Sequence, residues 1–343
     1  MRLRMSRKII KDTNTLTQIA EQVSTVLKAS RRILVASHID PDGDAIGTQL
    51  AFAAYLRDLG KEVFLVRQGD IPHKYRFLSG VDDIPHYREY ENSPPDIDTA
   101  LILECPNVER IGQASELLRP GVSIVNIDHH FDNSEFGAVN WIDSKASSVG
   151  EMAYEYFQAV GFEITQATAE QLYTAILTDT GRFRFSSTTP RTMEIAGELI
   201  AVGAHPQRIT DLVYFDVRSS TIKLVGKVLN NIEFLFDGRI CILTQTRKML
   251  EDAGAKASEV EGVVDYTLHS SGVIAGALLK ENGDAHTRVS FRSKDGINVA
   301  AIAARFGGGG HFNASGCTIP MPIEEARQEV IRLFTEALND NKS

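Results

Sequence analysis

His38-Ile-Asp-Pro-Asp-Gly-Asp44 follows the apolar run Ile33-Leu-Val-Ala36 after a single serine. The apolar run predicts a buried strand, and the proline and glycine predict a tight turn behind it. In open α/β sheets, ligands bind at the carboxyl ends of the strands, so chemistry is expected here. An imidazole beside carboxylate oxygens suits Mn²⁺ or Mg²⁺. Taken alone, the segment is also compatible with an acidic loop in which Asp44 is the N-cap of the next helix.

Three more apolar stretches end on groups of the same kind. Thr99-Ala-Leu-Ile-Leu103 ends on Glu104, Val122-Ser-Ile-Val-Asn-Ile127 ends on Asp128-His-His130, and a fourth stretch breaks at Asp179. Short apolar runs separated by helical segments are typical of a parallel sheet, whose strand ends share one edge. So many carboxylates would repel each other without cations, so they predict two divalent ions. The candidate metal ligands are His38, Asp42, Asp44, Glu104, His129 and Asp179.

These motifs resemble those of a known superfamily. His38-x-x-x-Asp42-x-Asp44, Asp128-His129-His130 and Asp179-Thr180-Gly181 are similar to the motifs of the DHH phosphoesterases. The later segment Gly307-Gly-Gly-Gly-His311 resembles the glycine-rich signature of the companion DHHA1 domain, together with Ala314-Ser-Gly316 and Arg292-Ser293. The order and extent of the match favour the NrnA-type subgroup of oligoribonucleases (nanoRNases) and pAp phosphatases.

The resemblance implies a fold and an activity. We expect an α/β parallel-sheet DHH domain over residues 1–203, a helical linker over 204–236 and a smaller α+β DHHA1 domain over 237–343, with the active site in the cleft between the domains. The implied reaction is hydrolysis of short oligoribonucleotides to mononucleotides, and of 3'-phosphoadenosine 5'-phosphate (pAp) to AMP. Two divalent metal ions would serve as cofactors, Mn²⁺ first, with Mg²⁺ or Co²⁺ accepted.

The resemblance also implies roles for individual residues. One ion would be held by His38, Asp42 and Glu104, and the other by Asp44, Glu104, His129 and Asp179. Asp128 would orient His129 or the groups around the metal ligands, and His130 would donate to a phosphate oxygen or to the leaving group. The expected substrate-binding residues are Arg292, Ser293, Gly308, Gly309, Gly310 and His311. For the glycine run, the alternative is a flexible loop between two elements.

Glu104 stands where the family usually carries an aspartate that bridges both metals. Its carboxylate reaches one methylene further, which would shift the metals, change the preferred metal or be absorbed by a small backbone adjustment; a protein that has lost hydrolysis is the alternative tied to this residue. The alternatives are a linear or cyclic dinucleotide phosphodiesterase, a relative of the single-strand DNA exonucleases, and a nucleotide-binding sensor without hydrolysis. A pyrophosphatase is disfavoured by the glycine-rich run. Metal titration would separate the sensor, which would hold fewer than two ions per chain, from the enzymes.

Composition narrows the substrate and the compartment. The chain has 343 residues and a net charge of −9, with 43% hydrophobic and 24% charged residues. A protein that follows long nucleic acid needs an extended basic surface, so we expect short RNA or a nucleotide bisphosphate and no long duplex. The basic start precedes no apolar signal segment, and no run is long enough to span a membrane. Three widely spaced cysteines predict free thiols in the cytoplasm. A homodimer is expected only from the resemblance.

Apolar periodicity and breaker residues predict the other elements. The second half differs from the first in that its strands run together, and turn residues 282–284 predict a hairpin. The expected helices are 15–28, 45–60, 148–160, 168–177, 191–202, 219–234 and 323–338, and the expected further strands are 63–66, 238–244, 273–279 and 287–291.

Overall fold

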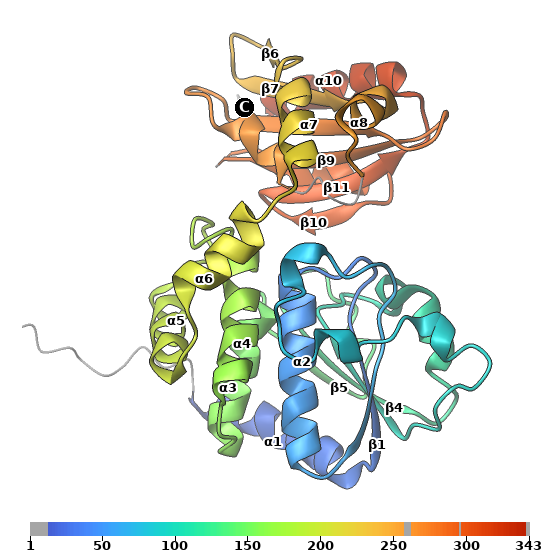
Figure 1. Ribbon diagram of the computed structural model, residues 1–343, viewed down its shortest axis with the longest axis vertical. Coiled ribbons are helices and arrows are strands. Elements are labelled where there is room, and N and C mark those ends of the chain that lie inside the picture. Colours follow the sequence, from blue (N-terminus) through green and yellow to red (C-terminus); the bar gives the residue numbers. More distant parts are fainter. Residues whose placement is uncertain (1–12, 257–261, 295, 341–343) are drawn as a thin grey trace, which may run out of the picture. The chain divides into compact units, whose positions relative to one another are not determined.

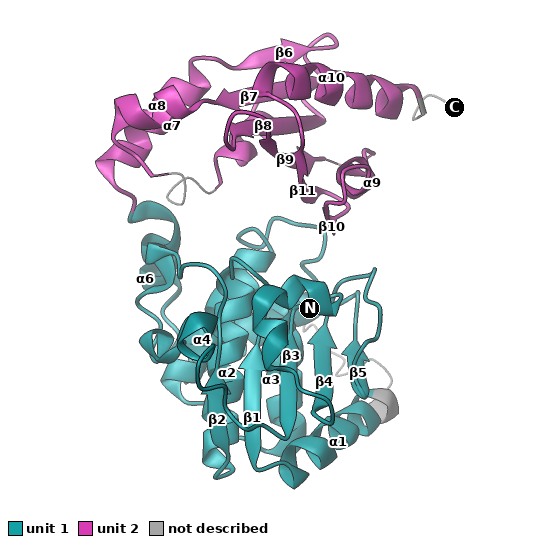
Figure 2. Ribbon diagram, turned by 90° about the vertical axis from the view of Figure 1, so that its right-hand side faces the viewer, with its two compact units in different colours: residues 1–216 teal, residues 217–343 magenta. Residues whose placement is uncertain are grey.

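The protein divides into two compact units at Asp216 and Val217 (Figure 2). The computed structural model describes residues 13–256, 262–294 and 296–340. Residues 204–236, the predicted linker, are shared between the units: the first unit closes with a short helix and a π-helical turn, and the second opens with a helix.

The first unit contains a five-stranded parallel sheet (Figure 1). Its order is β2-β1-β3-β4-β5, and every neighbouring pair is parallel. The predicted strands and the parallel pairing are confirmed, whereas β5 was not predicted because its four residues are mostly half-buried and include a polar asparagine. The strands are β1 (Arg32–Ala36), β2 (Glu62–Leu65), β3 (Thr99–Leu103), β4 (Ser123–Asp128) and β5 (Val139–Ile142).

Alternate residues of β1 enter two different hydrophobic clusters. Ile33 and Val35 belong to the cluster that includes the helices, while Leu34 and Ala36 belong to a smaller cluster on the other face. Successive side chains of a strand point to opposite faces, so a strand buried on both faces is apolar throughout. This explains why the run before His38 is continuous and not alternating.

The α-helices of the first unit pack on one face of the sheet, and 3₁₀ segments and loops cover the other face. The α-helices are α1 (Thr13–Ala29), α2 (Gly43–Asp58), α3 (Val149–Val160), α4 (Gln166–Asp179), α5 (Pro190–Val202) and α6 (Pro206–Thr210). Single turns and short 3₁₀ or π segments are His73–Tyr75, Val81–Asp83, Tyr87–Glu89, Val108–Leu117 and Asp211–Phe215. The predicted helices of this unit are confirmed, with ends that differ by a few residues.

Small residues let α2, α3 and α4 approach one another closely. A Cβ on Gly47 of α2 would lie 2.4 Å from the carbonyl oxygen of Gln171 in α4, and one on Gly150 of α3 would lie 2.7 Å from Ala175 Cβ. Only glycine fits at such contacts. The close packing brings the start of α2, the start of α3 and the end of α4 together, and all three contribute to the site described below.

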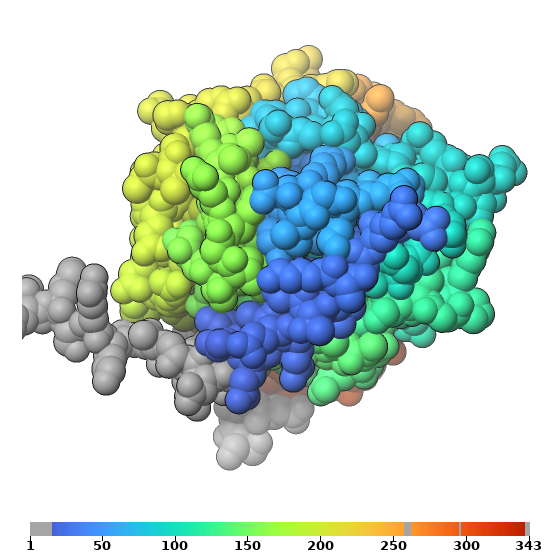
Figure 3. All heavy atoms as spheres, turned by 90° about the horizontal axis from the view of Figure 1, so that it is seen from below, coloured from blue at the N-terminus to red at the C-terminus, as the bar shows by residue number. Residues whose placement is uncertain are grey.

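Helix α1 lies at the opposite end of the sheet from the strand ends that carry the polar groups. Ser30, just after α1, lies with its hydroxyl 2.6 Å from that of Thr99, the first residue of β3. Ser24 Oγ lies 3.0 Å from the Tyr156 hydroxyl of α3. Figure 3 shows α1 in dark blue on this face of the unit. The helix therefore closes the amino end of the sheet and leaves the carboxyl end open to other elements.

The second unit is built on a six-stranded mixed sheet of order β10-β11-β9-β8-β7-β6. Strands β7 and β8 are parallel, and the other neighbours are antiparallel. The strands are β6 (Glu233–Leu235), β7 (Ile240–Gln245), β8 (Ala275–Glu281), β9 (Thr287–Ser293), β10 (Gly309–His311) and β11 (Ala314–Ile319). The helices are α7 (Ser219–Leu229), α8 (Arg247–Ala253), the 3₁₀ segment Val263–Leu268, α9 (Val299–Ala304) and α10 (Ile323–Asp340).

The predicted fold class is confirmed, with one wrong helix end in the second unit. The hairpin of β8 and β9 and the closing helix α10 are as predicted. The helix predicted over 219–234 ends at Leu229, because Phe234 pairs with Cys241 as part of β6. Antiparallel pairing with the next strand, β7, overrides the local helical pattern there. The three cysteines are free and buried. In the described ranges no helix is both long and apolar enough to cross a membrane.

Candidate metal centre

Parallel strands deliver the candidate ligands to one edge of the first sheet. His38 lies two residues beyond β1, Glu104 directly follows β3, and His129 directly follows β4. The amide of Glu104 donates to the carbonyl of Ile127 at 3.0 Å, which extends the pairing of β3 with β4 by one residue. The prediction that these side chains lie at one edge of the sheet is therefore confirmed.

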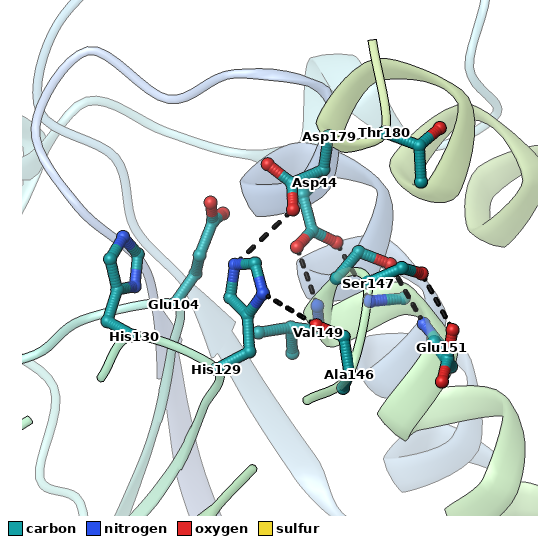
Figure 4. A network of polar contacts seen from close by, with 12 residues as sticks. Asp44, Glu104, His129, His130, Ala146, Ser147, Val149, Glu151, Asp179 and Thr180 are labelled. Carbon is teal, nitrogen blue, oxygen red and sulfur yellow. Dashed lines mark hydrogen bonds and ion pairs between the residues drawn. The ribbon is translucent and has the colours of Figure 1, made fainter. Parts of the chain in front are cut away.

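The two aspartates before α2 have different environments. Asp42 is the N-cap: its Oδ1 accepts from the amides of Asp44 at 3.0 Å and Ala45 at 3.1 Å. The alternative in which Asp44 is the N-cap is therefore wrong. Asp44 is fully buried, and its two oxygens accept from the amides of Val149 at 2.7 Å and Gly150 at 2.8 Å at the start of α3 (Figure 4). The positive end of the α3 dipole thus orients this carboxylate.

The candidate ligands form two groups. In each group the possible ligand atoms lie within 4.8 Å of one another: His38, Asp42 and Glu104 make one group, and Asp44, His129 and Asp179 make the other. His38 Nε2 is 3.6 Å from Glu104 Oε2 and 3.9 Å from Asp42 Oδ1. His129 Nε2 is 3.4 Å from Asp179 Oδ2 (Figure 4). Distances just beyond hydrogen-bond length leave space for a small cation between the atoms.

Both histidines present one ring nitrogen to the carboxylates and the other to the backbone. Nδ1 of His38 lies 2.8 Å from the carbonyl of Ile39, and Nδ1 of His129 lies 3.3 Å from that of Ala146. Burial lowers the pKa of each imidazole, which favours the neutral ring. A neutral ring with Nδ1–H on a carbonyl offers a lone pair at Nε2, the usual arrangement of a metal-ligating histidine.

Glu104 has the environment of a group that lacks its counter-charge. Its side chain is almost fully buried, and Oε2 has no hydrogen-bond partner among the described residues. Its backbone has φ of 57°, a conformation rare for residues other than glycine. Strain and an unpaired buried oxygen at the same residue are tolerated where function requires them. A divalent cation at this oxygen would satisfy it, so the residues present fit a metal.

Burial and mutual repulsion disfavour ionisation of the carboxylates. Burial, followed by the charge of Asp179, raises the pKa of Asp44 to about 8, and burial with the charge of Asp42 raises that of Asp179 to about 8. Burial and the surrounding aspartates raise the pKa of Glu104 well above its usual range. Asp179 is also the last residue of α4, where the helix dipole opposes a negative charge. Cations would remove these costs together.

Asp128 and His130 form a separate pair beside the two groups. His130 Nδ1 lies 2.7 Å from Asp128 Oδ1, and Asn133 Nδ2 donates to Asp128 Oδ2 at 2.6 Å. Burial would raise the pKa of Asp128, but these contacts outweigh it and lower that pKa. Burial would likewise lower the pKa of His130, but Asp128 raises it. Asp128 therefore supports His130, whereas the predicted partner was His129 or the groups around the metal ligands.

The predicted substrate-binding residues lie together in the second unit, at β9 and β10. Arg292 Nε donates to Asp265 Oδ1 at 3.0 Å, and Ser293 Oγ donates to the carbonyl of Ile297 at 2.7 Å. Ser293 is buried, so its hydroxyl has a structural role. The roles of Arg292 and His311 toward a substrate stay predictions.

The structure requires glycine at two positions of the glycine run but not at a third. A Cβ on Gly308 would lie 2.2 Å from the Gly316 carbonyl, and Gly310 has φ of 133°. These two permit the tight β10–β11 turn. A Cβ on Gly309, by contrast, would meet nothing within 4 Å. Because Gly309 and Gly310 belong to β10, the alternative of a flexible loop is wrong for this part of the run.

Comparison with known proteins shows the family. The model of the DHH family, N-terminal domain, matches residues 32–176, and that of the DHHA1 domain matches 239–340. The bifunctional oligoribonuclease and PAP phosphatase NrnA of Thermus thermophilus is 34% identical over 325 residues, which cover 92% of this chain and 93% of that protein. The chain belongs to the DHH family. The resemblance inferred from the motifs is thereby confirmed.

Other members of the DHH family agree with this assignment. NrnA of Bacillus subtilis is 32% identical over 292 residues, covering 84% of this chain and 89% of that protein. The crystal structure of an exopolyphosphatase-related protein from Bacteroides fragilis has a TM-score of 0.86 and 26% identity, and covers 98% of each chain. Both likenesses extend over the DHH and DHHA1 regions.

Sequence reasoning missed the supports of this DHH-family site. Asn133, and the amides of Val149 and Gly150, follow no strand and carry no motif. Glu151 was also missed: it is buried and accepts from the Ser147 hydroxyl at 2.7 Å (Figure 4). It also accepts from the Thr192 hydroxyl at 2.7 Å, and the two contacts anchor the start of α3. The Ser-x-x-Glu spacing of 148–151 is a helix-start signal that could have predicted the first turn of α3. No local signal, however, shows that the amides of this turn bind the carboxylate of Asp44.

Proposed function

We propose that this protein is a phosphoesterase that hydrolyses short oligoribonucleotides to mononucleotides, and pAp to AMP, with two divalent cations. The observation that carries the proposal is the pair of ligand groups at one sheet edge, with the unsatisfied Glu104 Oε2 between acidic neighbours. Relatives named oligoribonuclease and PAP phosphatase match nearly the whole chain, which supports the choice of substrate.

In this proposal the six ligands divide between two cation sites. His38, Asp42 and Glu104 hold one cation, and Asp44, Glu104, His129 and Asp179 hold the other. Oxygen and imidazole ligands favour Mn²⁺ and also accept Mg²⁺ or Co²⁺. Such cations, when bound, lower the pKa of water and offset phosphate charge. The protein's own part is to hold the carboxylates in place before the cations arrive, as the α3 amides do for Asp44.

His130 acts as the proton donor in this proposal. Asp128 accepts from its Nδ1 and raises its pKa, which keeps the ring protonated closer to neutral pH. Nε2 then carries a proton that can be donated to a phosphate oxygen or to the leaving oxygen. Asn133 holds the second oxygen of Asp128, so the carboxylate and the imidazole keep one orientation.

The second unit binds the nucleotide in this proposal, through Arg292 and the β10 segment with His311. β10 is the edge strand of its sheet, and the space beside Gly309 is open, so a substrate can lie directly on the main chain. The guanidinium of Arg292 suits phosphate oxygens. A cleft site between the units, a cytoplasmic location and a homodimer stay predictions.

The test is hydrolysis of a diribonucleotide and of pAp by the purified protein with Mn²⁺, with products separated by chromatography. We expect turnover that a chelator abolishes, and loss of turnover in Asp42→Asn and His129→Ala. His311→Ala should mainly raise KM. Asp58→Asn, an exposed carboxylate at the far end of α2, is the matched control and should turn over normally. Normal turnover in Asp42→Asn would refute the metal assignment.

A further inference from the structure

The second unit contains a basic cavity that the proposed reaction does not use. It measures about 600 Å³ and lies between α7 and α8, which Figures 1 and 2 show side by side. Its lining is Lys223, Gly226, Lys227, Asn230, Asn231, Thr246, Lys248, Met249 and Asp252. Three lysines face one aspartate here, in a chain whose net charge is −9. The cavity is a hollow that is widely open to solvent, and its volume is in the range of small-molecule sites.

One face of α7 carries the residues that line the cavity. Lys223, Gly226, Lys227 and Asn230 follow the three- and four-residue spacing of a helix face. The opposite face holds Leu224 and Val228, which are fully buried against α8 and the sheet. The cavity face is therefore not needed for packing.

That face is locally unfavourable for a helix. Gly226 lies inside α7, where glycine is less stable than alanine, and a Cβ there would meet nothing within 4 Å. Lys223 and Lys227 are like charges four residues apart, which repel. No contact within the described chain explains the glycine. Unfavourable local choices concentrated on one face are expected at functional sites.

Lysine also appears where the α8 dipole opposes it. Lys248 lies in the first turn of α8, near the positive end of the helix, and this turn contains no acidic residue. Lys227 pairs with Asp252 at 3.4 Å, whereas neither Lys223 nor Lys248 has an ion-pair partner in the parts of the chain that the structure describes. Two ammonium groups of the cavity are thus available to an anion.

We propose that this cavity binds a small nucleotide that carries at least two phosphates. The ammonium groups of Lys223 and Lys248 would contact the phosphates, and the missing side chain at Gly226 lets the ligand lie against the helix backbone. The carboxamide of Asn230 and the side chain of Met249 offer a polar and an apolar contact to a base. The three lysines line one hollow that also contains the exposed Asp252, and the exposed Glu251 precedes Asp252 in the chain, which favours a compact anion over an RNA strand.

The test measures binding of α,β-methylene-ADP, which resists hydrolysis of its diphosphate, to the full-length protein by calorimetry in the presence of chelator. We expect Lys223→Ala and Lys248→Ala each to weaken binding roughly tenfold, as loss of a charged hydrogen bond does. Lys28→Ala, an exposed lysine of α1, is the matched control and should bind like the wild type. Equal affinity in all these proteins would overturn the proposal.

Gly226→Ala distinguishes a ligand site from a merely structural feature. Alanine should raise the melting temperature, because it favours the helix, and yet weaken nucleotide binding, because its methyl group enters the cavity. Undiminished binding in Gly226→Ala would overturn the contact with the helix backbone. Lysine-dependent binding of a 12-nucleotide RNA without binding of the nucleotide would overturn the proposal in favour of an RNA surface. These variants should keep wild-type pAp hydrolysis, so the outcome is independent of the proposed function.

Discussion

Removing divalent cations should make the stability of the first unit fall as pH rises from 6 to 8. Asp44 and Asp179 have a pKa of about 8 in the folded protein, against an ordinary value of 3.8. The folded state therefore keeps protons that the unfolded state has already released. The free energy that the protonated forms of Asp44 and Asp179 contribute to folding is fully present below pH 3.8 and is lost as the pH rises to 8. Near-neutral pH lies inside this window, so ordinary buffers reach it.

The expected size of the loss follows from the linkage between protons and folding. Each pH unit over which the folded state holds one extra proton changes the free energy of unfolding by about 1.4 kcal/mol. For a single proton retained by the cluster with a pKa of about 8, the change between pH 6 and pH 8 is about 2 kcal/mol. The lowered pKa values of His38 and His129 act in the opposite direction, chiefly below pH 7, so the fall is clearest above that pH. Saturating Mn²⁺ should reverse the trend, because cations compete with the protons and bind more tightly as pH rises.

Urea unfolding, followed by tryptophan fluorescence, measures this change in the stability of the first unit. Trp141 in β5 is the chain's one tryptophan and is buried in the first unit, so its signal reports unfolding there. In Asp179→Asn the new amide side chain does not titrate, so the free energy of unfolding in chelator should depend less on pH. Asp58→Asn should keep the pH dependence of the wild type. Identical stability of the chelated protein at pH 6 and pH 8 would refute the reasoning.

Three further predictions concern single substitutions. Glu104→Gln removes the charge at the unsatisfied oxygen and should lower Mn²⁺ affinity by roughly tenfold or more in a calorimetric titration; unchanged affinity would exclude Glu104 as a ligand. Asp128→Asn removes the partner that raises the pKa of His130, so that pKa should fall in an NMR titration of the ring, and a constant value would contradict the proposed pair. Gly47→Ala places a methyl group against α4 and should destabilise the protein by roughly 1–3 kcal/mol, whereas Gly197→Ala, with open space around it, should stabilise it slightly; equal effects on the melting temperature would argue against the close α2–α4 contact.

The candidate site was largely predictable because three of its six ligands, His38, Glu104 and His129, follow strand ends directly or within two residues. An apolar run followed by His38, by Glu104 or by Asp128-His129 is a local pattern, and parallel pairing then places the run ends on one edge. The same reasoning failed for the short strands β5 and β6. Their few residues have little periodicity, and they become strands only by pairing with β4 and β7.

The sequence by itself determined the alternation of strands and helices, the family and the six candidate ligands, because apolar periodicity and motif spacing are properties of neighbouring residues. Only the tertiary structure decided how those ligands are held. The carboxylate of Asp44 accepts hydrogen bonds from the amides of Val149 and Gly150, more than a hundred residues away. The carbonyl oxygen of Gln171 in α4 lies against Gly47 in α2. Such contacts depend on how helices pack onto a sheet, and no local pattern encodes which backbone groups that packing leaves free to bind a carboxylate.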